Sequence, residues 1–87
     1  MLDEIKIQQA YKIIGQNVAK ARKKRKISQL ALSLEMGYRS VSVVSFAEIC
    51  LNGAHFNIAH LLQIAKILDV PFVSLFEGID ELIGLEI

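Results

Sequence analysis

The sequence predicts an all-α domain of five helices. Apolar residues recur at helical spacing along most of the chain, no segment of useful length alternates like a β-strand, and one proline and five glycines separate the helical segments. The 87 residues suit one small domain, in which about 60–70% of the surface of the unfolded chain can be buried. Because 53% of the residues are hydrophobic, we expect self-association through an apolar face.

The first predicted helix spans about five turns and ends in basic residues, which interact favourably with its dipole. Its inward face carries Ile7, Tyr11, Ile14, Val18 and Ala21. Ser28 suits the N-cap of a second, short helix from Gln29 to about Met36, in which Leu32 and Met36 face inward. Gly37 then suits a left-handed residue that stops this helix and redirects the chain.

Ser40 is the predicted cap of a third helix, which continues through Leu51. Its inner stripe consists of Val41, Val44, Ala47 and Leu51. Asn57 caps a fourth helix, which Val70 and Pro71 close. The core candidates of this fourth helix are Leu61, Leu62, Ile64, Ala65 and Leu68. A short fifth helix over about residues 72–76 precedes the tail GIDELIGLEI. We assign residues 1–78 to the domain and residues 79–87 to a short apolar C-terminal tail.

Charge is distributed unevenly along the chain. Residues 1–47 hold nine Lys or Arg and three acids, a balance of +6, whereas residues 48–87 hold one Lys and six acids, a balance of −5. Six of the seven residues at positions 20–26 are basic, which fits a footprint for a polyanion. A solvated, charged helix end is the alternative interpretation of this run.

Four segments carry a family resemblance. They are IGQNVAKARKKRKISQ at 14–29, the turn at Gly37, VSFAE at 44–48 and LLQIAKILDVPFVSLF at 61–76. On these segments the sequence resembles the lambda-repressor-like, Cro-type helix-turn-helix family, also called the xenobiotic-response-element family. The resemblance implies a five-helix DNA-binding domain over residues 1–78, in which the third helix enters the major groove while the second crosses the phosphates.

The sequence departs from the family pattern in two ways. VSFAE stands one residue later relative to Gly37, so we expect a turn that is longer by one residue, and the segment from Glu48 to Leu61 is also longer. Leu30, Ala31 and Phe46 occupy positions where the family favours polar or basic residues. These changes reduce the polarity of a face that is expected to be exposed to water.

The basic run and the second helix supply the expected phosphate contacts. The cations are Arg22, Lys23, Lys24, Arg25 and Lys26. Gln29, at the N-terminus of the second helix, is expected to hydrogen-bond a phosphate oxygen, and a solvated glutamine is the alternative. Arg39 is the candidate for reading guanine O6 and N7, with a phosphate contact as its alternative role.

The exposed side of the third helix is expected to face base pairs. Ser40, Ser42, Val43 and Ser45 fill this side, where short hydroxyl groups allow close approach and Val43 can touch a thymine methyl group. Phe46 has two interpretations: added core packed on Leu30 or a neighbouring helix, or a contact to DNA or a second subunit.

Other classes of function are disfavoured. A zinc site built from Cys50, His55 and His60 lacks a fourth ligand, and neither paired catalytic acids nor a phosphate-cradling glycine loop occurs, so we expect no enzyme activity, metal or cofactor. The N-terminus lacks the pattern of a secretory signal, and the longest stretch without charge is too polar to span a membrane. With a single cysteine, these features favour a soluble protein of the cytoplasm.

The predicted function is that of a small sequence-specific transcriptional regulator, a repressor that binds a partly palindromic operator as a homodimer. The apolar tail is the candidate dimer face, with packing on its own subunit as the alternative. The alternative function is a protein-interaction module of the same fold, such as the antitoxin of a toxin–antitoxin pair.

Overall fold

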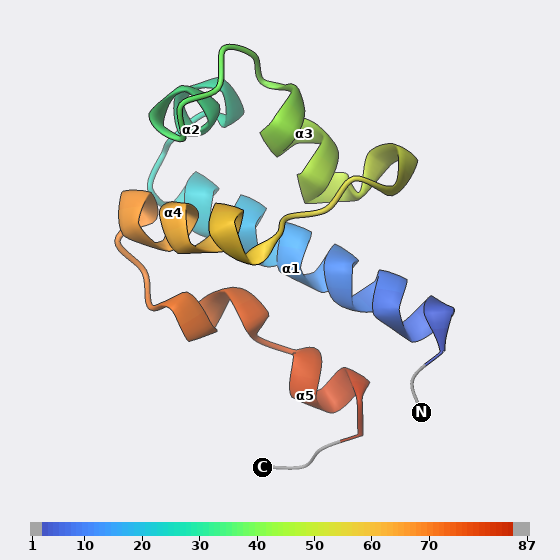
Figure 1. The fold of residues 1–87 in the computed structure, drawn as a ribbon. Helices are drawn as coiled ribbons and strands as arrows, with labels where there is room; N and C mark the ends of the chain where they lie inside the picture. Colours follow the sequence, from blue (N-terminus) through green and yellow to red (C-terminus); the bar gives the residue numbers. More distant parts are fainter. Residues whose placement is uncertain (1–2, 85–87) are drawn as a thin grey trace.

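The computed structural model describes residues 3–84, and all the regular structure in this range is helical (Figure 1). The α-helices are α1 (Glu4–Lys24), α2 (Gln29–Glu35), α3 (Ser42–Ile49), α4 (Ile58–Leu68) and α5 (Ile79–Leu82), and the 3-10 helices are η1 (Leu51–Gly53) and η2 (Phe72–Phe76). The all-α prediction is therefore confirmed. The predicted fifth helix is the 3-10 helix η2, and the last α-helix lies within the tail.

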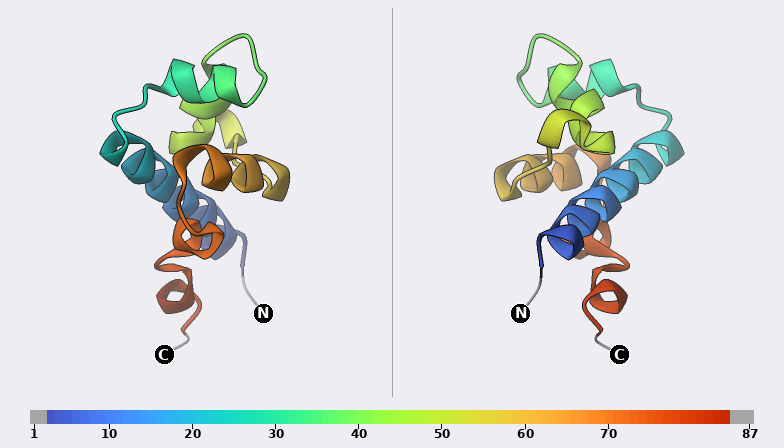
Figure 2. Two further views of the ribbon diagram at one scale, coloured as in Figure 1. Left: turned by 90° about the vertical axis from the view of Figure 1, so that its left-hand side faces the viewer. Right: turned by 90° about the vertical axis from the view of Figure 1, so that its right-hand side faces the viewer.

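The helices are arranged around α1, which is the longest. The pair α2 and α3 lies at one end of the molecule, η2 and α5 lie at the opposite end, and α1 and α4 lie between them (Figures 1 and 2). Asp3 caps α1 by accepting a hydrogen bond from the Lys6 N–H at 2.9 Å. The basic residues at the other end of α1 complement its dipole, as the sequence predicts.

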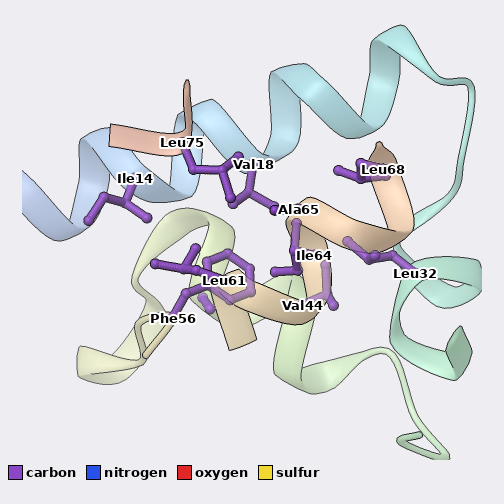
Figure 3. Packing of buried hydrophobic residues seen from close by; sticks show 11 residues of the cluster. Ile14, Val18, Leu32, Val44, Phe56, Leu61, Ile64, Ala65, Leu68 and Leu75 are labelled. Atoms are coloured by element: carbon purple, nitrogen blue, oxygen red, sulfur yellow. The ribbon is translucent and has the colours of Figure 1, made fainter. Parts of the chain in front are cut away.

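The core is formed by side chains from α1, α2, α3, α4 and η2 and from the loop before α4 (Figure 3). Its members are Ile14, Val18, Leu32, Val44, Ala47, Phe56, Leu61, Ile64, Ala65, Leu68 and Leu75. Nine of these were predicted from helical spacing, whereas Phe56 and Leu75 were not. The prediction for Leu62 is wrong, because α4 turns this side chain to the surface, where it is 56% exposed.

The predicted caps of α2 and α4 are confirmed. Ser28 Oγ accepts the N–H of Ala31 at 3.0 Å. Asn57 Oδ1 accepts the N–H of His60 at 2.8 Å, and His60 Nδ1 in turn accepts the N–H of Asn57, so the two residues form a capping box. These contacts set where each helix begins.

The predicted bounds of the third helix are too wide. Ser40 does not cap it: α3 starts at Ser42, with Val41 at the N-cap position and no side-chain cap. At the other end Cys50 adopts a left-handed conformation with φ of 56°, which ends the helix before Leu51. Since Val41 and Leu51 lie outside α3, they do not share its inner face, and both side chains are exposed.

Helix α1 passes very close to the end of α3 at Gly15. A Cβ atom at this position would lie 2.5 Å from the carbonyl oxygen of Glu48 and 2.8 Å from that of Ala47. No other residue type fits without moving one of the two backbones. Gly15 therefore sets the separation between α1 and α3.

The tail packs on its own subunit over the residues that the structure describes. Helix α5 contacts α1, Ile79 packs against the core, and Lys6 Nζ donates a hydrogen bond to the Leu82 carbonyl oxygen at 3.2 Å. Residues 85–87 of the tail, which is the candidate dimer face, lie outside the described residues. No helix between residues 3 and 84 has the length and hydropathy that a membrane span requires.

Candidate nucleic-acid interface

A glycine turn joins α2 to the loop that precedes α3. Gly37 has φ of 94°, its N–H donates to the Leu34 carbonyl, and the Tyr38 N–H donates to the Ser33 carbonyl, both at 3.0 Å. This is a Schellman motif, and it confirms the predicted helix stop at Gly37. The buried hydroxyl of Ser33 also donates to the Ser40 carbonyl, which anchors the loop on α2. The loop therefore has a defined path to the start of α3.

A buried ion pair joins the end of α1 to α3. Arg22 Nε lies 2.7 Å from Glu48 Oε2 and Arg22 Nη2 lies 3.0 Å from Glu48 Oε1, while Nη1 donates to the Ile27 carbonyl at 2.9 Å. The two side chains are only 9% and 3% exposed. Two parallel hydrogen bonds from a planar guanidinium fix orientation as well as distance. The pair therefore orients α3 relative to α1.

The expectation that Arg22 contacts phosphate is wrong, because its guanidinium is buried and bound within the protein. A signal for this was present in the sequence. Arg22 follows Ile14 and Val18 at intervals of four residues, which places all three on one face of α1. Glu48 follows Ala47 on the inner side of α3 and is the matching acid.

Gln29 also contacts this ion pair. Its amide nitrogen donates to Glu48 Oε1 at 2.8 Å, and the side chain is half-buried. The amide group keeps its second N–H and its oxygen for other contacts. Its predicted bond to a phosphate therefore remains a prediction, now for a side chain that is held in place by Glu48.

The remaining cations of the basic run lie on the surface. Lys23, Lys24 and Lys26 are exposed and form no ion pair within residues 3–84. Arg25 is exposed too, but its Nη2 donates to the Asp69 carbonyl at 2.9 Å and lies 3.6 Å from the Asp69 carboxylate. Three lysines are thus free to meet a polyanion, and Arg25 is partly engaged by the end of α4.

The predicted base-reading residues lie in the loop and in the first turn of α3. Arg39, Ser40 and Ser42 are exposed, whereas Val43 and Ser45 are half-buried on the flanks of the helix. The Ser42 N–H donates to Ser40 Oγ over a long 3.4 Å, and Ser45 Oγ donates to the Ser42 carbonyl at the same distance. The structure thus brings Ser40 and Ser42 together and leaves the Arg39 guanidinium without an ion-pair partner among the described residues.

The outward face of α3 is more apolar than predicted. At about 100° per residue, Ser42, Phe46 and Ile49 fall within one narrow sector, opposite the buried Val44 and Glu48. Phe46 is 40% exposed and Ile49 is 66% exposed. We call Ser42, Phe46 and Ile49 the outer stripe of α3. Ile49 was not predicted, because only Ser40, Ser42, Val43 and Ser45 were assigned to the exposed side of this helix.

His60 connects the cap of α4 to the loop before α3. Its Nδ1 accepts the Asn57 N–H at 3.1 Å, which leaves the proton of the neutral ring on Nε2, 3.1 Å from the Tyr38 hydroxyl. Burial and the nearby His55 lower the pKa of His60 below its ordinary value of 6.5. The Asn57 contact therefore requires a neutral His60, whereas Nε2–H can donate to the Tyr38 hydroxyl in either protonation state of the ring.

The three residues considered for a zinc site have other contacts. His55 stacks on Tyr11 with ring centroids 3.8 Å apart, and His60 belongs to the capping box. Burial raises the pKa of the Cys50 thiol, with Lys12 opposing the shift. The part of the chain that the structure describes holds no group of three His, Cys, Asp or Glu side chains that could bind a metal ion.

Comparison of the chain with models of known protein families gives no match, and comparison with curated proteins gives none either.

Proposed function

We propose that the protein is a lambda-repressor-like helix-turn-helix regulator that binds double-stranded DNA in a sequence-specific manner. The observation that carries this proposal is the way in which the fold holds α3. Its inner side is held by the core and by the Arg22–Glu48 pair, while its outer stripe is open to solvent. A helix held rigidly with one free face suits insertion into a major groove.

Charge supports the same function. Lys23, Lys24 and Lys26 are exposed just before α2, and Arg39 is exposed just before α3. Exposed cations near the start of each helix suit binding to a polyanion. The outer stripe itself carries no charge, which suits contact with base edges.

We further propose that the protein acts as a repressor and that two copies bind a partly palindromic operator. Exposed apolar side chains on the outer side of α4 and on η2, namely Ile58, Leu62 and Val73, support self-association. Two copies related by a two-fold axis present their recognition helices to half-sites about one DNA turn apart. Sedimentation equilibrium with and without the operator duplex tests this assembly, and two chains per duplex are expected.

Selection of binding sites from random duplex DNA by the full chain tests the function. The selected duplex is then titrated against a scrambled duplex at two salt concentrations. We expect a symmetric motif, bound more tightly than the scrambled sequence, with an affinity that falls as salt rises. The absence of binding to any duplex contradicts the proposal.

Two substitutions separate base reading from phosphate contact. Arg39→Ala is expected to reduce the free energy of binding to the selected site by about 1–3 kcal/mol and to have little effect on binding to scrambled DNA. Lys24→Ala is expected to weaken binding to both duplexes equally. It is also expected to reduce the slope of log affinity against log salt concentration by about 1. Lys66→Ala, an exposed lysine on α4, is the matched control and is expected to change neither affinity.

A protein-interaction module, such as an antitoxin, is the second candidate function. The apolar outer stripe of α3 favours it, because an exposed Phe46 and Ile49 also suit a protein partner. Under this alternative, Phe46→Ala abolishes binding of a co-purifying protein, and no duplex is selected from random DNA.

A further inference from the structure

The outer stripe of α3 limits which base edges the helix can read. It consists of one hydroxyl side chain, Ser42, and two apolar side chains, Phe46 and Ile49. No amide, guanidinium or carboxylate lies on it. Adenine is read most specifically by an amide, guanine by a cation and cytosine by a carboxylate, and the stripe has none of these groups.

We infer that Phe46 and Ile49 read the C5-methyl groups of thymine, so that the operator half-site carries thymines opposite the outer stripe of α3. This inference rests on the proposed DNA-binding function and specifies the sequence class of its target. The thymine methyl group is the apolar feature that a major groove presents, and apolar side chains are its ordinary contacts.

The spacing of the two side chains fits this assignment. Phe46 and Ile49 are three residues apart on α3, so they lie about 4.5 Å apart along the helix axis. Successive bases of one strand are separated by about 3.4 Å. The two side chains therefore suit methyl groups on neighbouring base pairs, and Ser42, one turn before Phe46, is left to hydrogen-bond an adjacent base.

The surroundings of the stripe favour DNA over a wholly apolar partner. Exposed Arg39 precedes α3, and exposed Lys23, Lys24 and Lys26 precede α2. An uncharged strip accompanied by cations complements a groove whose floor carries methyl groups and whose rims carry phosphates. The half-buried Val43, which was predicted to contact thymine, lies on the flank of α3 and is less accessible than either Phe46 or Ile49.

Replacement of thymine by uracil tests the inference, because it removes the C5-methyl group and retains the Watson–Crick edge and the O4 acceptor. The full chain is titrated with its selected duplex and with duplexes that carry uracil at one thymine at a time. At one or two thymines per half-site we expect a loss of affinity of about fourfold for each methyl group.

Protein variants assign the methyl contacts to side chains. In Phe46→Ala and Ile49→Ala the sensitivity to uracil is expected to disappear at the thymine that each side chain contacts. Both side chains are exposed, so the variants are expected to fold, and circular dichroism checks this. Ile5→Ala, an exposed apolar residue near the start of α1, is the control and is expected to keep the full uracil effect.

Different experimental outcomes overturn the thymine inference, the assignment to Phe46 and Ile49, and the proposed function. Equal affinity for thymine and uracil duplexes, with site-selective binding retained, overturns the inference and leaves the proposed function standing. A uracil effect that survives in both α3 variants overturns the assignment to Phe46 and Ile49. Failure to bind any duplex overturns the proposed function, and the inference falls with it.

Discussion

Arg22 and Glu48 lie 26 positions apart in the chain, yet their side chains form a two-point ion pair in the interior. Gln29 adds a third hydrogen bond to the Glu48 carboxylate. Helices α1, α2 and α3 thus meet at one carboxylate. This contact, rather than apolar packing alone, sets the orientation of the helix that we propose to enter the groove.

Removal of one partner of this pair leaves a buried, unpaired charge. We expect Glu48→Ala to lower the free energy of unfolding by about 3–5 kcal/mol, measured by urea denaturation. The control is Asp69→Asn, which removes the exposed partner of Arg25 and retains a residue type that tolerates the left-handed backbone at this position. It is expected to cost less than about 1 kcal/mol. Equal losses in the two variants contradict a special role for the buried pair.

Gly15→Ala is expected to destabilise the protein by forcing α1 and α3 apart. The added methyl group would overlap the carbonyl oxygens of Glu48 and Ala47, which belong to backbone and cannot rotate away. Overpacking of this kind costs about 1–3 kcal/mol, measured by urea denaturation. Gln16→Ala, at the next and exposed position of α1, is the control and is expected to have little effect. Unchanged stability of Gly15→Ala would show that the helices tolerate a wider separation.

Leu32 and Leu34 provide a matched pair of leucines on α2. Leu32 is fully buried, whereas Leu34 is 53% exposed. We expect Leu32→Ala to cost about 2–5 kcal/mol in the free energy of unfolding, because it removes buried apolar atoms and leaves a cavity. Leu34→Ala is expected to change the free energy of unfolding by less than about 1 kcal/mol. A large effect of Leu34→Ala would indicate that a second copy covers this side chain.

The His60 contacts predict a dependence of stability on pH. Because the pKa of His60 is lowered in the folded state, the unfolded chain takes up a proton first as the pH falls below 6.5. The contribution of His60 to the free energy of unfolding is therefore complete above pH 6.5. It declines as the pH falls from 6.5 towards the pKa of His60 in the folded state, and it does not decline further at pH values below that pKa. Thermal unfolding between pH 7.5 and pH 5 measures this loss.

His60→Gln is the matched variant for this prediction. Glutamine at the third position of α4 can accept the Asn57 N–H as the capping box requires, and it does not titrate. We expect the drop in Tm between pH 7.5 and pH 5 to be smaller in this variant than in the unmodified chain. An identical drop in both proteins excludes His60 as its source.

Local sequence determined the helices and most of their ends. Ser28 and Asn57 cap α2 and α4 as predicted, and Gly37 ends α2, because a cap or a left-handed turn depends on residues within four positions of one another. Helical spacing likewise identified most of the core. It failed for Val41 and Leu51, because the ends of α3 were placed too far out.

The tertiary structure decided the character of the candidate site. In a run of six cations the spacing after Ile14 and Val18 places Arg22 on the inner face of α1, but Arg22 pairs with Glu48 only when α1 and α3 pack together. The exposure of the outer stripe of α3 likewise depended on packing, because Val44, Ala47 and Glu48 turn inward and leave Phe46 and Ile49 at the surface. Caps depend on neighbouring residues, but ion pairs and exposed faces depend on contacts between distant segments, which exist only after packing.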